Sequence, residues 1–581
     1  MSSSPGRFGL PSREEIYQSV SSFSVKQKII FLVILIVFTL SGLGILWQVN
    51  NFFIVDVAVP GGSLTEGVIG APSHINPLLA VTDADRDLSM LVYSGLLRPG
   101  TNSELILDLA KSYEVSPDGL TYIFKLRSAL TWQDGQPLTS GDVAFTIEKA
   151  QDPSIKSPKR ANWEGVRVVI NGPDEIKFIL KKPYASFLEN ATLGILPKHL
   201  WVNLKSEAWS LSDYNIKPIG SGPYKVSKVT KSAAGLPLAY NLSPFDKFAL
   251  WSPKITNLTL RFYGNEEDLK TAYERGEVES LGAISPALAL SLEARGATIT
   301  EIFLPRIFAV FFNQGGTPAL NDLSVRQALD LATNRQAIVK DIMKNKAVMI
   351  DNPIPPGSLG YLKKDSEPPF DLEKAKQLLE TNGWIIGSDN IRQKTNKKNT
   401  VKLEFSLAVP NVSELKAIAN LLQNNWQKIG ARVTVNVFEL GDLDQNVIRP
   451  RKFDTLVFGE IIGRNPDLYS FWHSSQRYWP GLNIAGYANV EADKKLENIR
   501  QTIDPTDGQA KYEKFQTELK KDRPAIFLYS PYFLYVMPDK IQGAEFPSLV
   551  TQAERFASVY KWYINQERVW KIFANYHSPA E

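Results

Sequence analysis

A run of 19 residues without a charged side chain, from Ile29 to Trp47, constrains this chain more than any other feature. At 1.5 Å of rise per residue, a helix of this length spans roughly the 30 Å hydrocarbon core of a bilayer. Its apolar side chains would cover every face of the helix, whereas a helix packed on a protein core keeps a polar face. The run therefore predicts a transmembrane helix over residues 26–50.

The charges on either side of the run predict its orientation. Lys26 and Lys28 precede it and Asp56 follows it, so the positive-inside rule places the N-terminus in the cytoplasm. We expect a single-pass protein of the plasma membrane, with the ectodomain on the extracytoplasmic face, periplasmic or outer. A cleaved signal peptide is the alternative, but residues 1–57 contain no Ala for a cleavage site, and the run exceeds the usual 7–15 residues of a signal core.

Length and composition restrict the ectodomain further. A chain of 581 residues is too long for one small core, so two or three lobes are expected. With 65 basic and 61 acidic residues mixed along it, the chain has no basic patch that would indicate nucleic acid as a partner. Cysteine is absent, which excludes disulfides, thiolate nucleophiles and a lipidated cysteine.

The segment from Ser116 to Phe145 predicts two turns, a strand and a helix start. Ser116-Pro117-Asp118-Gly119 has the residues of a β-turn, and Asp134-Gly135 supplies a second turn. From Leu120 onward, every second residue is a large apolar one, as in a strand with one face on a core: Leu120, Tyr122, Phe124 and Leu126 alternate with Thr121, Ile123, Lys125 and Arg127. Thr139 and Asp142 have the spacing of a capping box at a helix start. The segment therefore reads turn, strand, turn, helix.

This string, in this order, closely resembles the signature of the extracytoplasmic solute-binding proteins of family 5, which serve oligopeptide, dipeptide and nickel ABC importers. The family usually has Phe-His where this chain has Trp132-Gln133, which leaves the turn intact. Further blocks resemble the family in the same order along most of the ectodomain, and together they are highly specific: Asn76-Pro77, Ile219 to Tyr224, Leu269 to Glu279, Phe312 to Arg335 and Phe370 to Trp384.

The resemblance implies an α/β fold: a two-lobed, periplasmic-binding-protein-like ectodomain (type II, three regions) with mixed sheets, beside the N-terminal transmembrane helix. Alternating strand and helix patterns independently favour mixed α/β layers. The predicted ranges are a cytoplasmic tail (1–25), a transmembrane anchor (26–50), lobe I in three parts (51–95, 215–305 and 529–581), an extra subdomain (96–214) and lobe II (306–528). Residues 569–577 are expected to form a terminal amphipathic cap on lobe I.

The segment from Gly459 to Gln476 is predicted to contribute most to a ligand site between the lobes. Matching Pro466-Asp467 to the family pattern places Arg464 where an acidic residue usually pairs with the free amine of a peptide. A guanidinium would repel that amine and would bind a carboxylate or phosphate instead. Three hypotheses remain open: Arg464 binds an anionic group of the ligand, the register is different and Asp467 is the amine partner, or Arg464 forms a surface ion pair.

Other candidate ligand-binding residues follow from the same resemblance. Gly70, Ala71 and Pro72 resemble the loop after the family's first strand, whose backbone lies near the ligand, and main-chain hydrogen bonds there would hold a peptide without reading its side chains. Trp472 and His473 are candidates to line the cleft, although an aromatic residue near a strand end is more often part of a core. The predicted ligand-binding set is Gly70, Ala71, Pro72, Arg464, Asp467, Trp472 and His473.

No motif indicates catalysis, a cofactor or a metal site. The histidines at positions 74, 199, 473 and 577 are scattered, and the chain has no HExxH motif, no GxSxG elbow and no P-loop. We therefore expect a protein that is not an enzyme and that has no cofactor.

These observations predict a membrane-anchored receptor that captures a peptide-like solute and delivers it to an ABC permease and its ATPase subunits. Closure of the lobes over a solute that contacts both would supply the binding energy. A membrane-tethered ligand sensor, or a peptide-holding chaperone without transport, is the alternative that the sequence leaves open.

Overall fold

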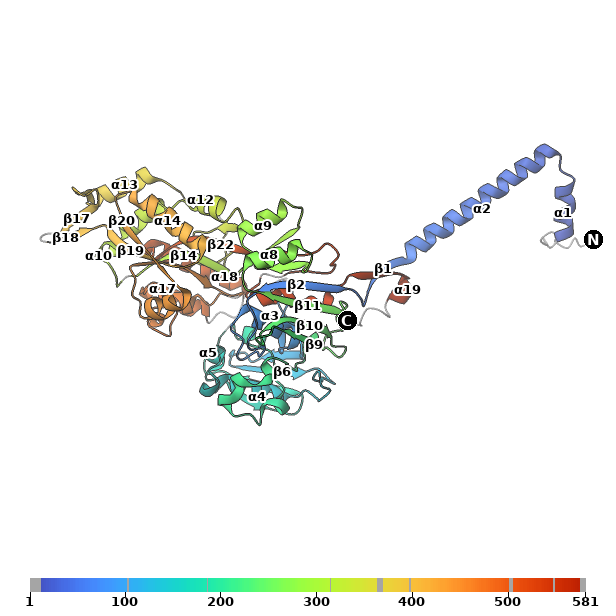
Figure 1. Ribbon diagram of the computed structural model, residues 1–581, viewed down its shortest axis with the longest axis horizontal. Coiled ribbons are helices and arrows are strands. Elements are labelled where there is room, and N and C mark those ends of the chain that lie inside the picture. The colour runs from blue at the N-terminus through green and yellow to red at the C-terminus, as the bar shows by residue number, and fades with distance from the viewer. Residues whose placement is uncertain are drawn as a thin grey trace, which may run out of the picture. The chain divides into compact units, whose positions relative to one another are not determined.

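The computed structural model describes residues 12–101, 104–184, 186–313, 315–362, 369–396, 399–464, 466–500, 505–546 and 549–574 (Figure 1). The chain forms two compact units, one of residues 60–564 and one that combines residues 1–59 with residues 565–581. Residues 1–11 of the predicted tail, Asn465 of the predicted site segment and residues 575–581 of the predicted cap lie outside the described residues.

The larger unit is organised by a long sheet that runs through both lobes. The spatial order of its main path is β20 (Arg432–Phe438), β19 (Glu404–Pro410), β21 (Thr455–Ile461), β14 (Arg306–Phe312), β22 (Ala525–Val536), β12 (Ser280–Gly282), β2 (Ser63–Ile69), β11 (Asn257–Tyr263), β10 (Pro237–Pro244) and β9 (Tyr224–Lys231). We call the part with β2 and β9 to β12 lobe I, and the part with β14 and β19 to β21 lobe II.

Strand β22 belongs to both lobes. Its first half pairs with β14 of lobe II and its second half pairs with β12 of lobe I, both antiparallel. Two shorter strands, β13 (Ile299–Phe303) and β15 (Ala347–Met349), also pair with β22. The lobes are therefore joined by continuous backbone hydrogen bonding along β22, and the hinge of any closure has to pass through this strand and the β13–β14 connection.

Lobe II is a three-layer sandwich. One face of its sheet packs on the core of α11, α13 and α14, and the other face packs on α16, α17 and α18. Figure 1 shows α13 and α14 on one side of the strands and α17 on the other. Each face needs this cover because β19 and β21 bury apolar side chains on both sides. Its helices are α10 (Pro318–Asn321), α11 (Leu323–Leu331), α12 (Arg335–Ala337), α13 (Leu372–Thr381), α14 (Ser413–Gln427), α15 (Leu440–Asp442), α16 (Leu468–Trp472), α17 (Val490–Arg500) and α18 (Pro505–Asp522).

The extra subdomain has its own sheet, in the order β5 (Ala110–Val115), β6 (Thr121–Leu126), β8 (Glu175–Ile179) and β7 (Arg167–Ile170). Its helices include α4 (Ser140–Gln151), α5 (Arg160–Trp163), α6 (Phe187–Asn190) and α7 (Lys198–Trp201), and those of lobe I include α3 (Asp83–Val92), α8 (Glu266–Glu274) and α9 (Pro286–Glu293). Both parts share one hydrophobic core, so the subdomain is an extension of lobe I.

The local predictions for the segment from Ser116 to Phe145 are confirmed. Strand β6 buries Tyr122, Phe124 and Leu126, as the alternation requires. The backbone N–H of Thr139 donates to the Asp142 carboxylate at 2.9 Å, which completes the start of α4. Gly119 and Gly135 have φ values of 67° and 88°, a conformation that glycine adopts without strain.

Lobe I contains a buried ion network that ties β2, α3 and the short helix η7 (Gln552–Phe556) together. The Arg555 guanidinium contacts the Asp87 carboxylate at 2.5 Å and the Glu66 carboxylate at 2.6 Å, with all three side chains at most 2% exposed. The Tyr535 hydroxyl donates to the second oxygen of Glu66 at 2.6 Å. Every charge of this network thus has a partner, which buried charges require.

The smaller unit consists of α1 (Arg13–Ser21), α2 (Val25–Phe53), β1 (Ile54–Val59), β23 (Asn565–Trp570) and α19 (Lys571–Ala574). Helix α2 has 29 residues, none of them buried, and it is long and apolar enough to cross a membrane. Strands β1 and β23 pair antiparallel, and the Trp570 indole N–H donates to the Asn50 side-chain oxygen at 3.0 Å.

Residues 51–59 and 565–574, which the sequence predicts as parts of lobe I, group with α2 in the smaller unit. Val569 and Trp570, at the start of the predicted amphipathic cap, end β23, where their strand partners lie more than 500 residues away in the sequence. The predicted domain ranges and the predicted cap stay predictions.

Candidate functional site

The carboxyl ends of the parallel strands mark the candidate site. In lobe I, β2 runs parallel to β11 and β12, and in lobe II, β19 runs parallel to β20 and β21. Ligands of open α/β sheets bind in the crevice outside the carboxyl ends of such strands. In this chain, residues that follow β12, residues at or after the carboxyl ends of β19 and β20, and residues in the last half of β21 line the same cavity.

This interlobe cavity has a volume of about 420 Å³, which lies within the range of small-molecule sites. Lobe I contributes Ala283, Ile284 and Pro286 after β12. Lobe II contributes Pro410 at the end of β19, Val412 after it, Leu440 after β20, and Gly459 and Ile461 of β21. Residues 529 and 531–534 of β22 complete the lining at the junction of the lobes. The cavity is thus mainly apolar and lined by both lobes, so a solute inside it would contact both.

Two aromatic side chains face each other in this lining. Phe308 of β14 and Tyr529 of β22 stack with ring centroids 4.9 Å apart and planes at 4°. A Cβ at Gly459 would lie 2.7 Å from the Phe308 ring, so only glycine fits beside this pair on β21. Tyr529 is only 2% exposed and belongs to the core of lobe II, whereas Phe308 is half-buried, so the Phe308 ring supplies most of the aromatic surface that this pair presents to the cavity.

Three charged side chains also line the interlobe cavity: Arg306, Lys346 and Glu414. Lys346 is engaged, because its ammonium lies 2.6 Å from the Glu293 carboxylate and 2.9 Å from the Glu301 carboxylate. Burial lowers the pKa of the Arg306 guanidinium from its ordinary value, and the charge of Asp83 opposes this effect. These charges supply the few polar groups that a mostly apolar site needs for specificity.

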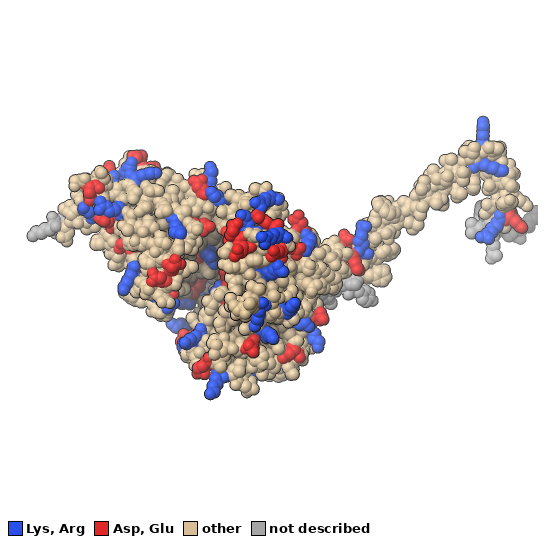
Figure 2. Space-filling model, viewed as in Figure 1, with Lys and Arg blue, Asp and Glu red and all other residues tan. Residues whose placement is uncertain are grey.

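A second cavity, of about 280 Å³, lies between lobe I and the extra subdomain. Its lining includes Arg86, Lys159, Glu189 and Glu554. Two of these residues, Glu189 of α6 and Glu554 of η7, bind Arg464 of lobe II. In the space-filling view the surface is hollowed where lobe II approaches the extra subdomain (Figure 2).

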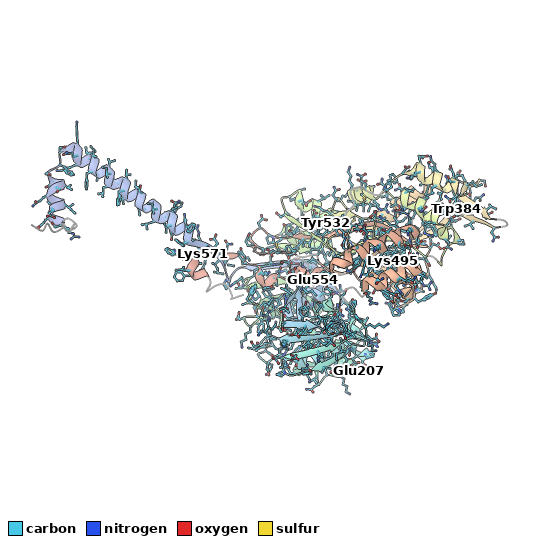
Figure 3. The ribbon with its side chains drawn as sticks, turned by 180° about the vertical axis from the view of Figure 1, so that it is seen from behind. Glu207, Trp384, Lys495, Tyr532, Glu554 and Lys571 are labelled. Carbon is cyan, nitrogen blue, oxygen red and sulfur yellow. The ribbon has the colours of Figure 1, made fainter. Side chains whose placement is uncertain are left out.

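We call Arg464, Glu189 and Glu554 the clasp. The Arg464 Nη1 atom lies 3.0 Å from Glu189 Oε2 and its Nη2 atom lies 2.7 Å from Glu554 Oε2. The Arg464 side chain is only 4% exposed, and Figure 3 shows Glu554 between Tyr532 and the strands of the extra subdomain. One guanidinium therefore connects lobe II to both other parts of the larger unit.

The electrostatics of the clasp follow from its burial. Desolvation raises the pKa of Glu554 above its ordinary value, and the charge of Arg464 opposes the increase. The pKa of Glu189 shifts in the same direction for the same reasons. The guanidinium thus opposes the effect of desolvation on both carboxylates. Arg464 thus forms ion pairs, as one of the three hypotheses states. These ion pairs are buried between the lobes and do not lie on the surface.

Asp467 lies at the same contact between lobe II and the extra subdomain. Its carboxylate is 3.2 Å from the Arg500 guanidinium and accepts a hydrogen bond from the Ser470 hydroxyl at 3.0 Å. The Arg500 guanidinium carbon lies 4.4 Å from the centre of the Tyr469 ring and 5.4 Å from that of Tyr184 in the subdomain. Burial raises the pKa of Asp467, and Arg500 opposes this. The amine-binding role predicted for Asp467 stays a prediction.

The loop of Gly70, Ala71 and Pro72 follows β2, at the carboxyl edge of the lobe I sheet. Gly70 has φ of 89° and no atom within 4 Å of the position where a Cβ would lie, so a ligand backbone could approach it closely. None of the three residues lines either of the two cavities. Their contact with a ligand stays a prediction.

Trp472 and His473 lie inside lobe II and line neither cavity. Trp472 is 1% exposed, and its ring lies 6.1 Å from that of Phe311 and 5.8 Å from that of Phe527. His473 stacks on Tyr469 at 4.0 Å and bonds the Ser475 hydroxyl through Nδ1. The structure thus favours the alternative that the sequence left open, in which both residues belong to the core of the lobe.

Replacement of Trp472 by Phe tests this assignment. We expect the free energy of unfolding to fall by about 1–2 kcal/mol, because a smaller ring leaves a cavity in the core. The loss stays small because the buried indole N–H has no hydrogen-bond acceptor among the described residues, so the phenyl ring removes an unsatisfied donor. Urea unfolding measures the loss. Solute affinity should not change, and a tenfold loss of affinity would place Trp472 in the binding site instead.

Sequence reasoning missed Glu189, Glu554, Arg306 and Glu414. Glu189 and Glu554 sit in short helices with no motif, and Glu414 occupies the first turn of α14, where an acidic residue is ordinary. Arg306 had a usable signal, because it is a single charge at the start of the apolar strand β14. Within the described part of the chain, no cluster of His, Asp or Glu side chains could hold a metal ion.

The comparisons with known proteins agree on one family. The family model for bacterial extracellular solute-binding proteins, family 5 Middle, matches residues 104–479, more than half of the chain. The oligopeptide-binding protein AppA of Bacillus subtilis is 29% identical over 496 residues, which cover 84% of this chain and 89% of AppA. The dipeptide-binding protein of Escherichia coli is 24% identical over 488 residues, which cover 79% of this chain and 87% of that protein.

Solved structures show the same similarity in three dimensions. NikZ from Campylobacter jejuni, in complex with Ni(L-His), has a TM-score of 0.71 and 28% identity, covering 86% of this chain and 99% of NikZ. AppA from Bacillus subtilis, in complex with a nonapeptide, has a TM-score of 0.70 and 26% identity, covering 87% of this chain and 100% of AppA. The predicted two-lobed fold with mixed sheets is thereby confirmed. The chain belongs to the bacterial extracellular solute-binding proteins of family 5.

Proposed function

We propose that this chain captures a peptide-like solute in the interlobe cavity, outside the cytoplasm, and delivers it to an ABC permease and its ATPase without making or breaking covalent bonds. The observation that carries this proposal is that both lobes line one cavity at the carboxyl ends of their parallel strands. Relatives named as oligopeptide-binding, dipeptide-binding and glutathione-binding proteins support a solute with peptide bonds.

The cavity suits capture by closure. A solute that contacts lobe I and lobe II stabilises the closed form, whereas a solute that contacts one lobe binds the open and closed forms equally and shifts nothing. The clasp adds contacts that exist only when lobe II lies against the extra subdomain and η7. Solute and clasp would therefore favour the same closed form.

A direct test identifies what the full-length chain carries. The protein, purified in detergent from its own host, is denatured, and the released small molecules are identified by mass spectrometry. We expect peptides or compounds with peptide bonds, and we expect a synthetic sample of the main species to bind the emptied protein with a saturable isotherm. Release of sugars or lipids alone, with no saturable peptide binding, would overturn the proposal.

We further propose that α2 is an uncleaved anchor. Its 29 residues measure about 44 Å as a helix, enough to cross the hydrocarbon core. We expect the chain to stay in the membrane fraction after extraction at pH 11 and to be released by detergent, because burial of an apolar span is effectively irreversible. N-terminal sequencing should recover residues that precede Ile29. A mature chain that starts after Phe53 would show that α2 is a signal sequence.

A further inference from the structure

The interlobe cavity contains two opposite charges that do not neutralise each other. Arg306, at the start of β14, and Glu414, in the first turn of α14, both line it and are both half-buried. Among the described residues, neither side chain forms an ion pair or a side-chain hydrogen bond, with the other or with a third group. A half-buried guanidinium and a half-buried carboxylate have therefore lost part of their hydration without gaining a partner, which is unfavourable.

Tyr529 lies within reach of both charges. Burial raises the pKa of the Tyr529 hydroxyl, the charge of Glu414 raises it further, and the charge of Arg306 opposes the increase. Tyr529 also forms the aromatic stack with Phe308 in the cavity lining. The aromatic pair, a cation and an anion thus line the same cavity.

The other charges near the cavity are already matched. Lys346 is held by Glu293 and Glu301. Asp83, whose charge acts on the pKa of Arg306, already forms an ion pair with Arg86 at 3.1 Å. The clasp carboxylates are held by Arg464. Of the charged side chains that line the interlobe cavity, Arg306 and Glu414 are therefore the two that have no ion-pair partner among the described residues.

We propose that Arg306 and Glu414 bind the two ends of a zwitterionic solute, the carboxylate at Arg306 and the ammonium at Glu414, with the solute backbone beside the Phe308 ring. This inference rests on the proposed function. It assigns the recognition of both ends of the solute to the interlobe cavity, and it leaves Arg464 in the clasp, without contact to the solute. Charge-assisted hydrogen bonds to both ends would restore what burial removed from the two side chains.

The test uses end-modified peptides. The full-length protein in detergent is offered a synthetic library of random tri- to pentapeptides, and the retained peptides are identified by mass spectrometry. The best retained sequence is then made with both ends free, with an acetylated N-terminus and with an amidated C-terminus. We expect acetylation and amidation each to weaken binding about 10- to 100-fold, because each removes one charge-assisted interaction and leaves a buried charge unpaired.

Two variants assign the ends. In Glu414→Gln the affinities of the acetylated and the free peptide should agree within about threefold. Amidation of the C-terminus should still weaken binding about 10- to 100-fold. In Arg306→Gln the pattern should be reversed. Matched controls are Glu404→Gln and Arg449→Gln, which change exposed side chains of lobe II. Glu404 lies 3.6 Å from Arg432, and Arg449 lies 2.6 Å from Asp444. Both controls should discriminate as the unmodified chain does, and thermal unfolding verifies that all four variants fold.

The outcomes separate this inference from the proposed function. Retained peptides whose affinity ignores acetylation and amidation would overturn the inference while capture of peptides stands. Discrimination that survives unchanged in Arg306→Gln and Glu414→Gln would likewise overturn it and move the recognition of the ends elsewhere. If no member of the library is retained, the proposed capture of peptides fails and the inference fails with it.

Discussion

The Arg464→Met variant is expected to lose the closed form. Removal of the guanidinium leaves Glu189 and Glu554 buried without their cation, and breaking a buried ion pair in this way costs about 3–5 kcal/mol. Opening of the lobes lets water reach both carboxylates, so the cost falls on the closed form. A change of about 3 kcal/mol shifts the ratio of closed to open molecules by about 100-fold.

The chain offers a clean measurement, because it contains no cysteine. Spin labels at Glu207→Cys in the extra subdomain and Lys494→Cys in α17 of lobe II attach to these two exposed positions alone. We expect the distance distribution of the Arg464→Met protein to be longer and broader than that of the labelled parent. Solute affinity should fall as well, since solute has to close the lobes without the clasp.

A matched control is Arg449→Met, which removes an exposed arginine of lobe II whose pair with Asp444 is 43% and 45% exposed. Such exposed pairs contribute little, so the label distances should not change. Identical distance distributions for Arg464→Met and its parent would mean that the clasp does not hold the lobes together.

The Arg555→Met variant is expected to lose about 3–5 kcal/mol of unfolding free energy, because Asp87 and Glu66 stay buried in lobe I without a cation. Unlike the clasp, this network lies within one lobe, so opening of the cleft cannot hydrate it. The loss should therefore appear in the midpoint of urea unfolding and not in label distances between lobes. The control is Arg261→Met, which removes an exposed ion pair in which the Arg261 guanidinium lies 3.5 Å from the Glu277 carboxylate. This variant should change the unfolding free energy by less than about 0.5 kcal/mol.

The pH dependence of Arg555→Met has a definite sign. Burial raises the pKa of Asp87 from 3.8 to about 6, although the Arg555 charge lowers it. Without Arg555 the folded-state pKa rises further, so between about pH 4 and that higher value the folded protein binds a proton that the unfolded protein does not. Unfolding free energy then falls as pH rises. The deficit relative to the parent should be larger at pH 8 than at pH 5, and an equal deficit at both would contradict this account.

The local elements of the fold were accessible from the sequence because their causes are local. The alternation from Leu120 to Leu126 and the cap formed by Thr139 and Asp142 depend on residues a few positions apart. The apolar run that forms α2 is of the same kind, since its composition alone makes it a helix that could cross a membrane.

The candidate site was less accessible. Arg464 stood out as a departure from the family pattern, but its partners are 275 and 90 positions away, and nothing in the surroundings of Glu189 or Glu554 indicates a buried ion pair. Trp472 and His473 lie in the segment predicted to form the pocket, yet their side chains face the core of lobe II. The direction of a side chain depends on how its strand and helix pack.

The sequence by itself determined the family, the two-lobed α/β class and the apolar helix α2, because turn residues, caps and hydrophobic periods act over short distances. Tertiary structure alone decided which charges meet: Arg464 with Glu189 and Glu554, Arg555 with Glu66 and Asp87, and Arg306 and Glu414 at one cavity. Such contacts join segments hundreds of residues apart, and their energies depend on burial, which exists only after the lobes have packed.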